Sequence, residues 1–257
     1  MTITMKSTYI TVVFLITIAS NAFGQDSELK KEQVQSIQKL INIFKTKDKT
    51  KIAARIYYPL RREYPLKDVK NKIEFIQRFD EIFDNVFLDQ VAESTAKEWS
   101  EVGWRGIMLD NGTVWIDEEG KIMTVNYQSP KEKLLLADAI RADKDRLPKS
   151  LQNFARPIYL IFTKNYKIRI DEKATGIYRY AAWKIKSPKS EPDIIIENGV
   201  WEFQGSGGNH TITFRNNGFI YLVSVNIIGS EDMPDATLEV SKDEKLLLTE
   251  DGKIKRN

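Results

Sequence analysis

The sequence predicts an α+β protein in which N-terminal helices pack on a curved antiparallel sheet and a small all-β portion follows. Two observations predict this order. Apolar residues recur every three or four positions between residues 34 and 87, which indicates helices with one buried face. From residue 102 onward the apolar period falls towards two, which indicates half-buried strands.

The first 24 residues have the organisation of a cleavable secretory signal peptide. Lys6 supplies a positive charge, an apolar run covers residues 10–19, and Ala22 and Gly24 precede the expected cut before Gln25. The apolar run is shorter than the roughly 20 residues that a membrane-spanning helix needs. We therefore expect a periplasmic or secreted protein with no membrane span after cleavage. An uncleaved membrane anchor is the alternative.

Composition excludes several chemistries. The chain has no cysteine, which rules out disulfides, cysteine nucleophiles and thiolate metal sites, and which together with the short signal favours a bacterial protein. Its formal net charge is +3 with basic and acidic residues interspersed, so we expect no nucleic-acid partner. No phosphate-binding or dinucleotide motif occurs. We expect no cofactor, no metal site and no catalytic residue.

The helices are expected in a definite order. A first helix has its buried face over residues 34–44, a second covers about 50–58, and a third begins after an Asp68 N-cap and carries an apolar stripe over 69–87. A later helix over 130–146 should begin at a Ser129 cap, to which Glu132 would return a hydrogen bond.

Strands account for most of the remaining chain. The turns at 110–112 (Asp-Asn-Gly) and 117–120 (Asp-Glu-Glu-Gly) separate three strands of an antiparallel meander. Further strands are expected at 158–162, 166–170, 177–185, 201–203, 211–214, 219–228, 237–240 and 246–248. Residues 186–192 contain two prolines and are read as a linker between an α+β domain (25–185) and a small all-β domain (193–257). A single continuous domain is the alternative.

Helices followed by a curved sheet resemble, in element order, the cone-shaped NTF2-like superfamily over residues 28–185. The helix at 130–147 departs from that pattern. The runs Gly-Trp-Arg-Gly-Ile-Met-Leu (103–109) and Asn-Gly-Thr-Val-Trp (111–115) are similar to a stretch seen in uncharacterised exported bacterial proteins. The NTF2-like superfamily includes enzymes, ligand carriers and toxin-immunity proteins, so the resemblance leaves function open.

Aromatic and basic residues of the meander form the main candidate site, which comprises Trp99, Trp104, Arg105, Trp115 and Tyr127. If Trp104, Trp115 and Tyr127 lie on neighbouring strands, a concave face could hold an apolar or aromatic ligand while Arg105 fixes an anionic group. Trp and Arg are also frequent in protein-binding hot spots. Alternatively, these rings pack beneath the helices.

Three further residues are weaker candidates. His210, the one histidine, and Asn209 end a glycine-rich turn that could cradle an anion, although glycines with positive φ in a β-hairpin would give the same pattern. Arg179 lies beside Tyr180 and Trp183 in a second aromatic and basic group.

The sequence therefore favours an exported, non-catalytic binding protein that acts on another exported or periplasmic protein, as an inhibitor or immunity factor does. The alternative is a cone-fold protein, either an enzyme or a binder of small ligands, that uses the face formed by Trp104, Arg105 and Tyr127. A protein complex would support the first hypothesis, and a deep pocket at that face would support the second.

Overall fold

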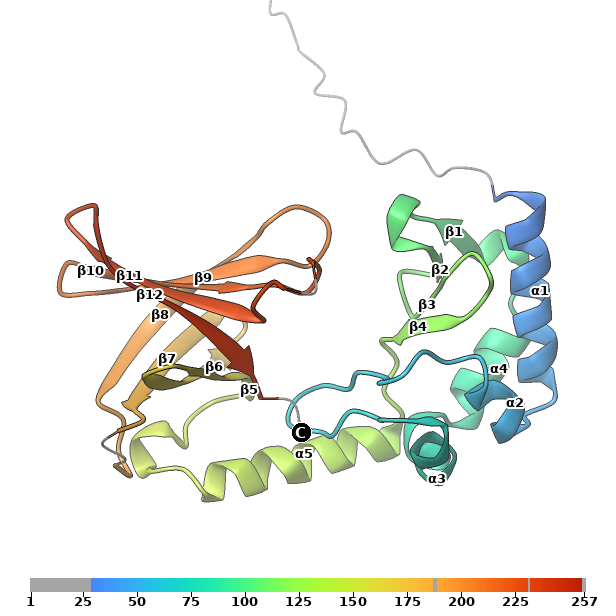
Figure 1. The fold of residues 1–257 in the computed structure, drawn as a ribbon. Helices are drawn as coiled ribbons and strands as arrows, with labels where there is room; N and C mark the ends of the chain where they lie inside the picture. Colours follow the sequence, from blue (N-terminus) through green and yellow to red (C-terminus); the bar gives the residue numbers. More distant parts are fainter. Residues whose placement is uncertain (1–28, 187–188, 231, 256–257) are drawn as a thin grey trace, which may run out of the picture.

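The computed structural model describes residues 29–186, 189–230 and 232–255. The expected signal peptide lies outside these residues. The chain is α+β, with a four-stranded antiparallel sheet and a closed eight-stranded barrel. Helices α1–α4 and the sheet form one unit, the barrel forms another, and helix α5 runs along both (Figure 1). Within the described residues, no helix has the length and apolarity needed to cross a membrane.

The helices are α1 (Lys31–Lys45), α2 (Lys49–Ala53), α3 (Lys72–Ile82), α4 (Asn85–Glu93) and α5 (Pro130–Asp145), with 3₁₀ turns η1 (Ala96–Glu98), η2 (Gly103–Arg105) and η3 (Lys149–Leu151). The sheet contains β1 (Trp99–Glu101), β2 (Ile107–Leu109), β3 (Val114–Ile116) and β4 (Ile122–Val125). The barrel contains β5 (Arg156–Thr163), β6 (Tyr166–Ala174), β7 (Ile177–Lys184), β8 (Ile194–Phe203), β9 (His210–Asn216), β10 (Phe219–Val225), β11 (Ala236–Lys242) and β12 (Lys245–Ile254).

The expected third helix is two helices. The stripe over residues 69–87 is interrupted after α3, and α4 begins at a second cap, Asp84, whose carboxylate accepts from the Phe87 N–H at 2.9 Å. Asn71, not Asp68, caps α3, because Asp68 accepts hydrogen bonds from Arg61 and Arg62. Two short helices can each turn their apolar residues towards one core, which contains Phe83 and Phe87 with ring centroids 4.4 Å apart.

The barrel is formed by antiparallel pairing of each strand with its sequence neighbours, and β12 closes it by pairing with β5. Buried side chains from β5–β11, including Ile168, Tyr180 and Phe214, fill its interior, and β12 adds the partly buried Leu248 and Ile254. An eight-stranded barrel is just wide enough for side chains to fill it, so the middle of the barrel is a packed core. Hollows lined by its strands and connections lie at one end, beside the first unit.

The expected domain boundary falls inside this barrel. Residues 186–192 connect β7 to β8, which are hydrogen-bonded neighbours, and β5–β7 belong with the C-terminal strands. A polar, proline-containing stretch is equally suited to a hairpin loop and to a linker, which is why the sequence pattern misplaced the boundary. The likeness to the NTF2-like superfamily stays a prediction.

Helix α5 fixes the two units to each other through buried ion pairs. At its first turn Glu132 accepts from Arg62, and both side chains are almost fully buried. Near its last turn Asp143 accepts from Arg169 of β6 at 2.6 Å. The Arg62 contact holds residues 61–68, which we call the 61–68 loop, between the two units. Hydrogen bonds between Leu60 and Val69 close the base of this loop.

Candidate functional site

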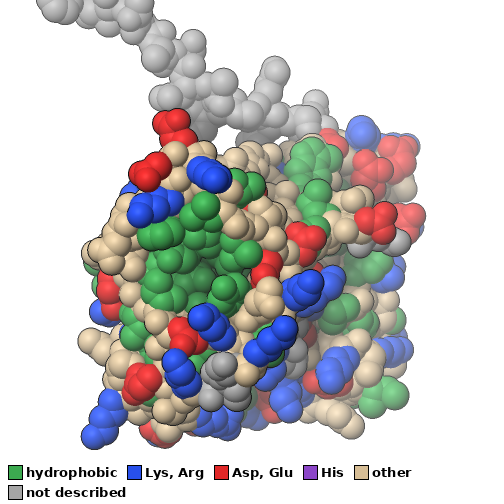
Figure 2. Space-filling model, turned by 60° about the vertical axis from the view of Figure 1, so that its left-hand side comes forward, with side chains coloured by type: hydrophobic (Ala, Val, Ile, Leu, Met, Phe, Trp, Pro, Cys, Tyr) green, Lys and Arg blue, Asp and Glu red, His purple; other side chains and the backbone are tan. Residues whose placement is uncertain are grey.

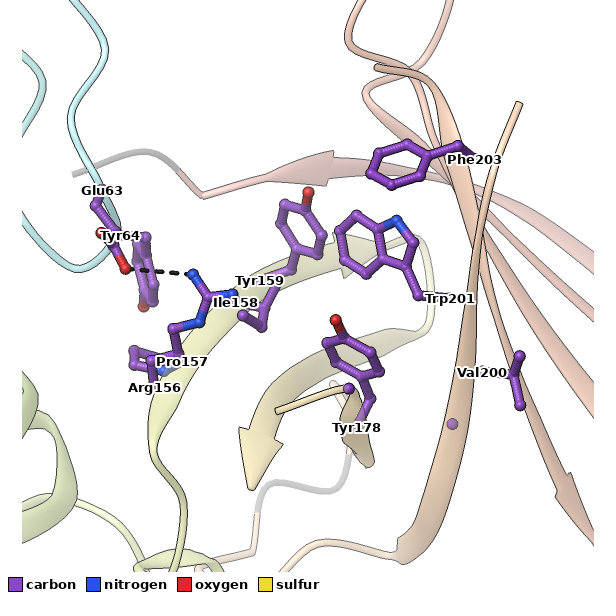
Figure 3. A pocket seen from close by; sticks show the side chains of 12 residues that line it. Glu63, Tyr64, Arg156, Pro157, Ile158, Tyr159, Tyr178, Val200, Trp201 and Phe203 are labelled. Carbon is purple, nitrogen blue, oxygen red and sulfur yellow. Dashed lines mark hydrogen bonds and ion pairs between the residues drawn. The ribbon is translucent and has the colours of Figure 1, made fainter. Parts of the chain in front are cut away.

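A groove opens at the end of the barrel that faces the 61–68 loop (Figure 3). Its volume is about 620 Å³, and we call it the barrel-mouth groove. Its aromatic lining residues are Tyr64, Tyr159, Tyr178, Trp201 and Phe203. The loop supplies Tyr64 and the barrel strands supply the other four, so the groove exists only where the two units meet.

Strand alternation places the four rings of the barrel strands on the inner side of the barrel. Trp201 and Phe203 are two residues apart on β8 and therefore share a face. Tyr178 of β7 pairs with Gly199, which lies two residues before Trp201 on β8. A Cβ at Gly199 would lie 2.2 Å from a ring carbon of Phe214, so only glycine lets the fully buried Phe214 ring fill the barrel directly below the groove.

His210 is part of the wall of rings. It stacks on Trp201 with centroids 3.7 Å apart, and its Nδ1–H donates to the Gly208 carbonyl at 2.8 Å. Its Nε2 is then left to accept from the Tyr159 hydroxyl at 3.1 Å. Burial lowers the pKa of His210, although the bond to Gly208 acts in the opposite direction. His210 is therefore neutral at pH 7 and orders the Trp201 side of the groove.

The charged groups of the groove are engaged with one another. Arg156 donates to Glu172 and, at 3.4 Å, to Glu63 across the groove (Figure 3). The hydrogen bond to Glu172 raises the pKa of Arg156. Burial would raise the pKa of Glu172, but hydrogen bonds from Arg156 and Gly176 bring it below its usual value. Burial, with the nearby Glu172 charge, also raises the pKa of Tyr178. The groove thus presents aromatic rings, the neutral hydroxyls of Tyr64 and Tyr178, and the paired charges of Arg156 and Glu63.

A second hollow, of about 520 Å³, lies where the four-stranded sheet meets the β8–β9 and β10–β11 connections, and we call it the Trp104 hollow. Trp104, Arg105 and Trp115 line it from the sheet side, and Gly207 and Ile228 line it from the barrel side. Trp104 is 68% exposed, and the Arg105 guanidinium lies over the Trp115 ring, 5.7 Å from its centroid.

The other two residues of the main candidate set lie elsewhere. Trp99 is buried and donates its indole N–H to Ser94 at 3.1 Å. The Tyr127 hydroxyl bonds to the Asp84 carboxylate at 2.8 Å, and its ring stacks on Phe87. The expected face uniting Trp104, Arg105 and Tyr127 does not form, because Trp104 and Arg105 line the Trp104 hollow whereas Tyr127 lines a different hollow with Gln90 and Asn111.

The side chains of the weaker candidates Arg179 and Asn209 make hydrogen bonds within the protein that stabilise its fold. Arg179 is buried against Asp171, with a 2.6 Å contact, and also donates to the Leu151 carbonyl. The Asn209 side chain accepts from the backbone N–H groups of Ile227 and Ile228 and so joins the β8–β9 and β10–β11 connections. Neither side chain lines the barrel-mouth groove.

Sequence reasoning missed the rings at Tyr159, Tyr178, Trp201 and Phe203 as a site. Each fell on or beside an expected strand, but nothing local shows that these strands share a barrel end. Among the described residues, no group of three or more His, Asp or Glu side chains is arranged to hold a metal ion. Comparisons of the chain with protein-family models, curated proteins and solved structures give no significant match.

Proposed function

We propose that the chain is an exported, non-catalytic binding protein and that its barrel-mouth groove receives an aromatic or aliphatic side chain of another exported protein. The export part of the proposal rests on the signal-like pattern of residues 1–24. The binding part rests on one observation, a ring-lined hollow whose rim exposes apolar side chains. Phe203 is 69% exposed, and Val200, which also lines the hollow, is 57% exposed.

The chemistry of the groove supports contact rather than reaction. Arg156 is paired with Glu172, and both ring nitrogens of His210 have hydrogen-bond partners. Trp and Tyr are the residue types that contribute most at protein-binding hot spots, where they form pockets surrounded by a rim that excludes water. A volume of about 620 Å³ is ample for one large side chain. A complex of this kind is what an inhibitor or immunity-type factor forms.

The test compares Phe203→Ser with the unchanged protein in affinity purification from the cells that produce it, followed by mass spectrometry. Loss of a hot-spot side chain costs about 2 kcal/mol or more, or about 30-fold in Kd. We expect one stoichiometric protein partner with the unchanged protein and its loss with Phe203→Ser. Because Phe203 is exposed, this variant should fold normally.

The control is Leu246→Ser at the opposite end of the barrel. That end also exposes apolar side chains, and Figure 2 shows hydrophobic groups gathered on this face of the molecule. Leu246 is 56% exposed and is the second residue of β12, at the end of the strand far from the groove. We expect Leu246→Ser to retain the partner. Loss of the partner with Leu246→Ser alone would move the binding surface to the opposite end and contradict the proposal.

A further inference from the structure

The Trp104 hollow differs from the barrel-mouth groove in its charge. Of the described residues that line it, Arg105 alone carries a formal charge, and the lining contains no Asp or Glu. Within the described part of the chain, the Arg105 backbone N–H donates to the Val102 carbonyl, but the guanidinium makes no hydrogen bond or ion pair and its close contact is with the Trp115 ring. A guanidinium held over an indole keeps its hydrogen-bonding edge available for an anion.

The remaining walls are mostly apolar and are held in place by contacts between the sheet and the barrel. Its apolar lining residues are Trp104, Trp115, Met123 and Ile228, and Thr124 and Ser206 are the uncharged polar ones. A Cβ at Gly207 would lie 2.1 Å from Ile228 and 3.1 Å from Trp104, so the absence of a side chain there lets the indole and the barrel loop approach closely. The exposed Trp104 ring is thus supported on one side by the second unit of the protein.

We propose that the Trp104 hollow is a binding site for a small amphiphilic anion, a monocarboxylate with a hydrocarbon or aromatic body. The carboxylate pairs with the Arg105 guanidinium, whose planar fork matches two carboxylate oxygens. The apolar body lies against Trp104, Trp115 and Ile228, and the hollow of about 520 Å³ falls in the range of small-molecule sites. This site is separate from the proposed protein-binding groove and does not depend on it.

Charge complementarity selects this ligand class. A neutral hydrocarbon would leave the Arg105 charge in a partly apolar hollow without a counter-charge. A dianion would bring a second negative charge for which the lining has no cation. A single carboxylate supplies the counter-charge that Arg105 needs and brings no second negative charge. Its hydrogen bonds to the charged guanidinium also contribute more than hydrogen bonds between neutral groups.

The test uses decanoate as the probe and decan-1-ol as its uncharged counterpart. Binding to the purified protein is measured by calorimetry, and the site is located from the five tryptophan indole N–H resonances, assigned with Trp→Phe variants. We expect decanoate to shift the Trp104 and Trp115 resonances. Arg105→Gln should weaken decanoate binding about tenfold or more and leave decanol binding unchanged.

Arg141→Gln, on the exposed face of α5, is the matched control and should bind decanoate as the unchanged protein does. Arg105→Lys keeps the charge but loses the planar fork, so an intermediate affinity is expected. Three results would overturn the proposal. They are no decanoate binding at millimolar concentration, equal binding by Arg105→Gln, or shifts centred on Trp201, which would place the ligand in the barrel-mouth groove.

Discussion

Glu132→Gln tests how the 61–68 loop is held against the rest of the protein. The Glu132 and Arg62 side chains are 1% and 3% exposed, and Arg62 Nε donates to Glu132 Oε1 at 2.6 Å. Arg62 also donates to the carbonyls of Val125 and Tyr127 at 2.8 and 2.7 Å. The amide substitution preserves the shape of the side chain but leaves the Arg62 charge buried without a counter-charge.

The magnitude follows from this burial. Removing one member of a buried ion pair lowers the free energy of unfolding by about 3–5 kcal/mol. The amide oxygen of the glutamine can still accept a hydrogen bond from Arg62, so we expect a loss of about 3 kcal/mol. For a chain of this size, 1 kcal/mol shifts Tm by about 2–4 °C, so Glu132→Gln should lower Tm by roughly 6–12 °C. The assay is thermal unfolding followed by circular dichroism, with urea unfolding to give the free energy.

Asp138→Asn is the control on the same helix. Asp138 pairs with Arg141, but both side chains are largely exposed, and such pairs contribute less than about 1 kcal/mol. We therefore expect a Tm shift of no more than about 4 °C from this variant. If Glu132→Gln is no more destabilising than Asp138→Asn, the buried pair does not hold the loop, and the reasoning is refuted.

Two further predictions concern the barrel. Burial lowers the pKa of His210 below its ordinary value of 6.5, so the unfolded chain takes up the proton at a higher pH than the folded chain does. The free energy of unfolding should therefore fall as the pH drops below about 6.5, by at most about 1.4 kcal/mol per pH unit. His210→Gln should remove this part of the pH dependence of urea unfolding, and an unchanged slope would contradict the assignment. Gly199→Ala should cost about 1–3 kcal/mol, since its Cβ would meet the Phe214 ring. Phe214→Leu in the same chain should make the combined loss smaller than the sum, whereas simple additivity would show that the two positions do not touch.

Local patterns predicted local structure well. Helix α5 begins after Ser129, whose hydroxyl accepts from the Glu132 N–H at 3.0 Å, as the capping pattern indicated. The expected return bond from the Glu132 side chain is absent, because that carboxylate binds Arg62, 70 residues earlier. A charged partner distant in sequence outcompetes a local backbone group, and no local pattern reveals such a partner.

The candidate site shows the same limit. The meander pairs as the turns predicted, with Ile107 opposite Ile116 and Val114 opposite Val125, and this brings Arg105 close to Trp115. The barrel-mouth groove instead depends on the pairing of β12 with β5, which joins residues roughly 90 positions apart and closes the sheet. Hydrophobic periodicity identified most of these strands but carries no information about which end of which strand meets another.

The most direct test of the proposed protein-binding groove is photo-crosslinking in the producing cells, with a benzophenone amino acid placed at Phe203 in one variant and at Leu246 in another. Both positions are exposed, so each probe reports only on what contacts its own end of the barrel. We predict one discrete crosslinked protein from position 203 and none from position 246. No adduct at position 203, or the same adducts from both positions, would contradict the claim that the groove is the binding surface.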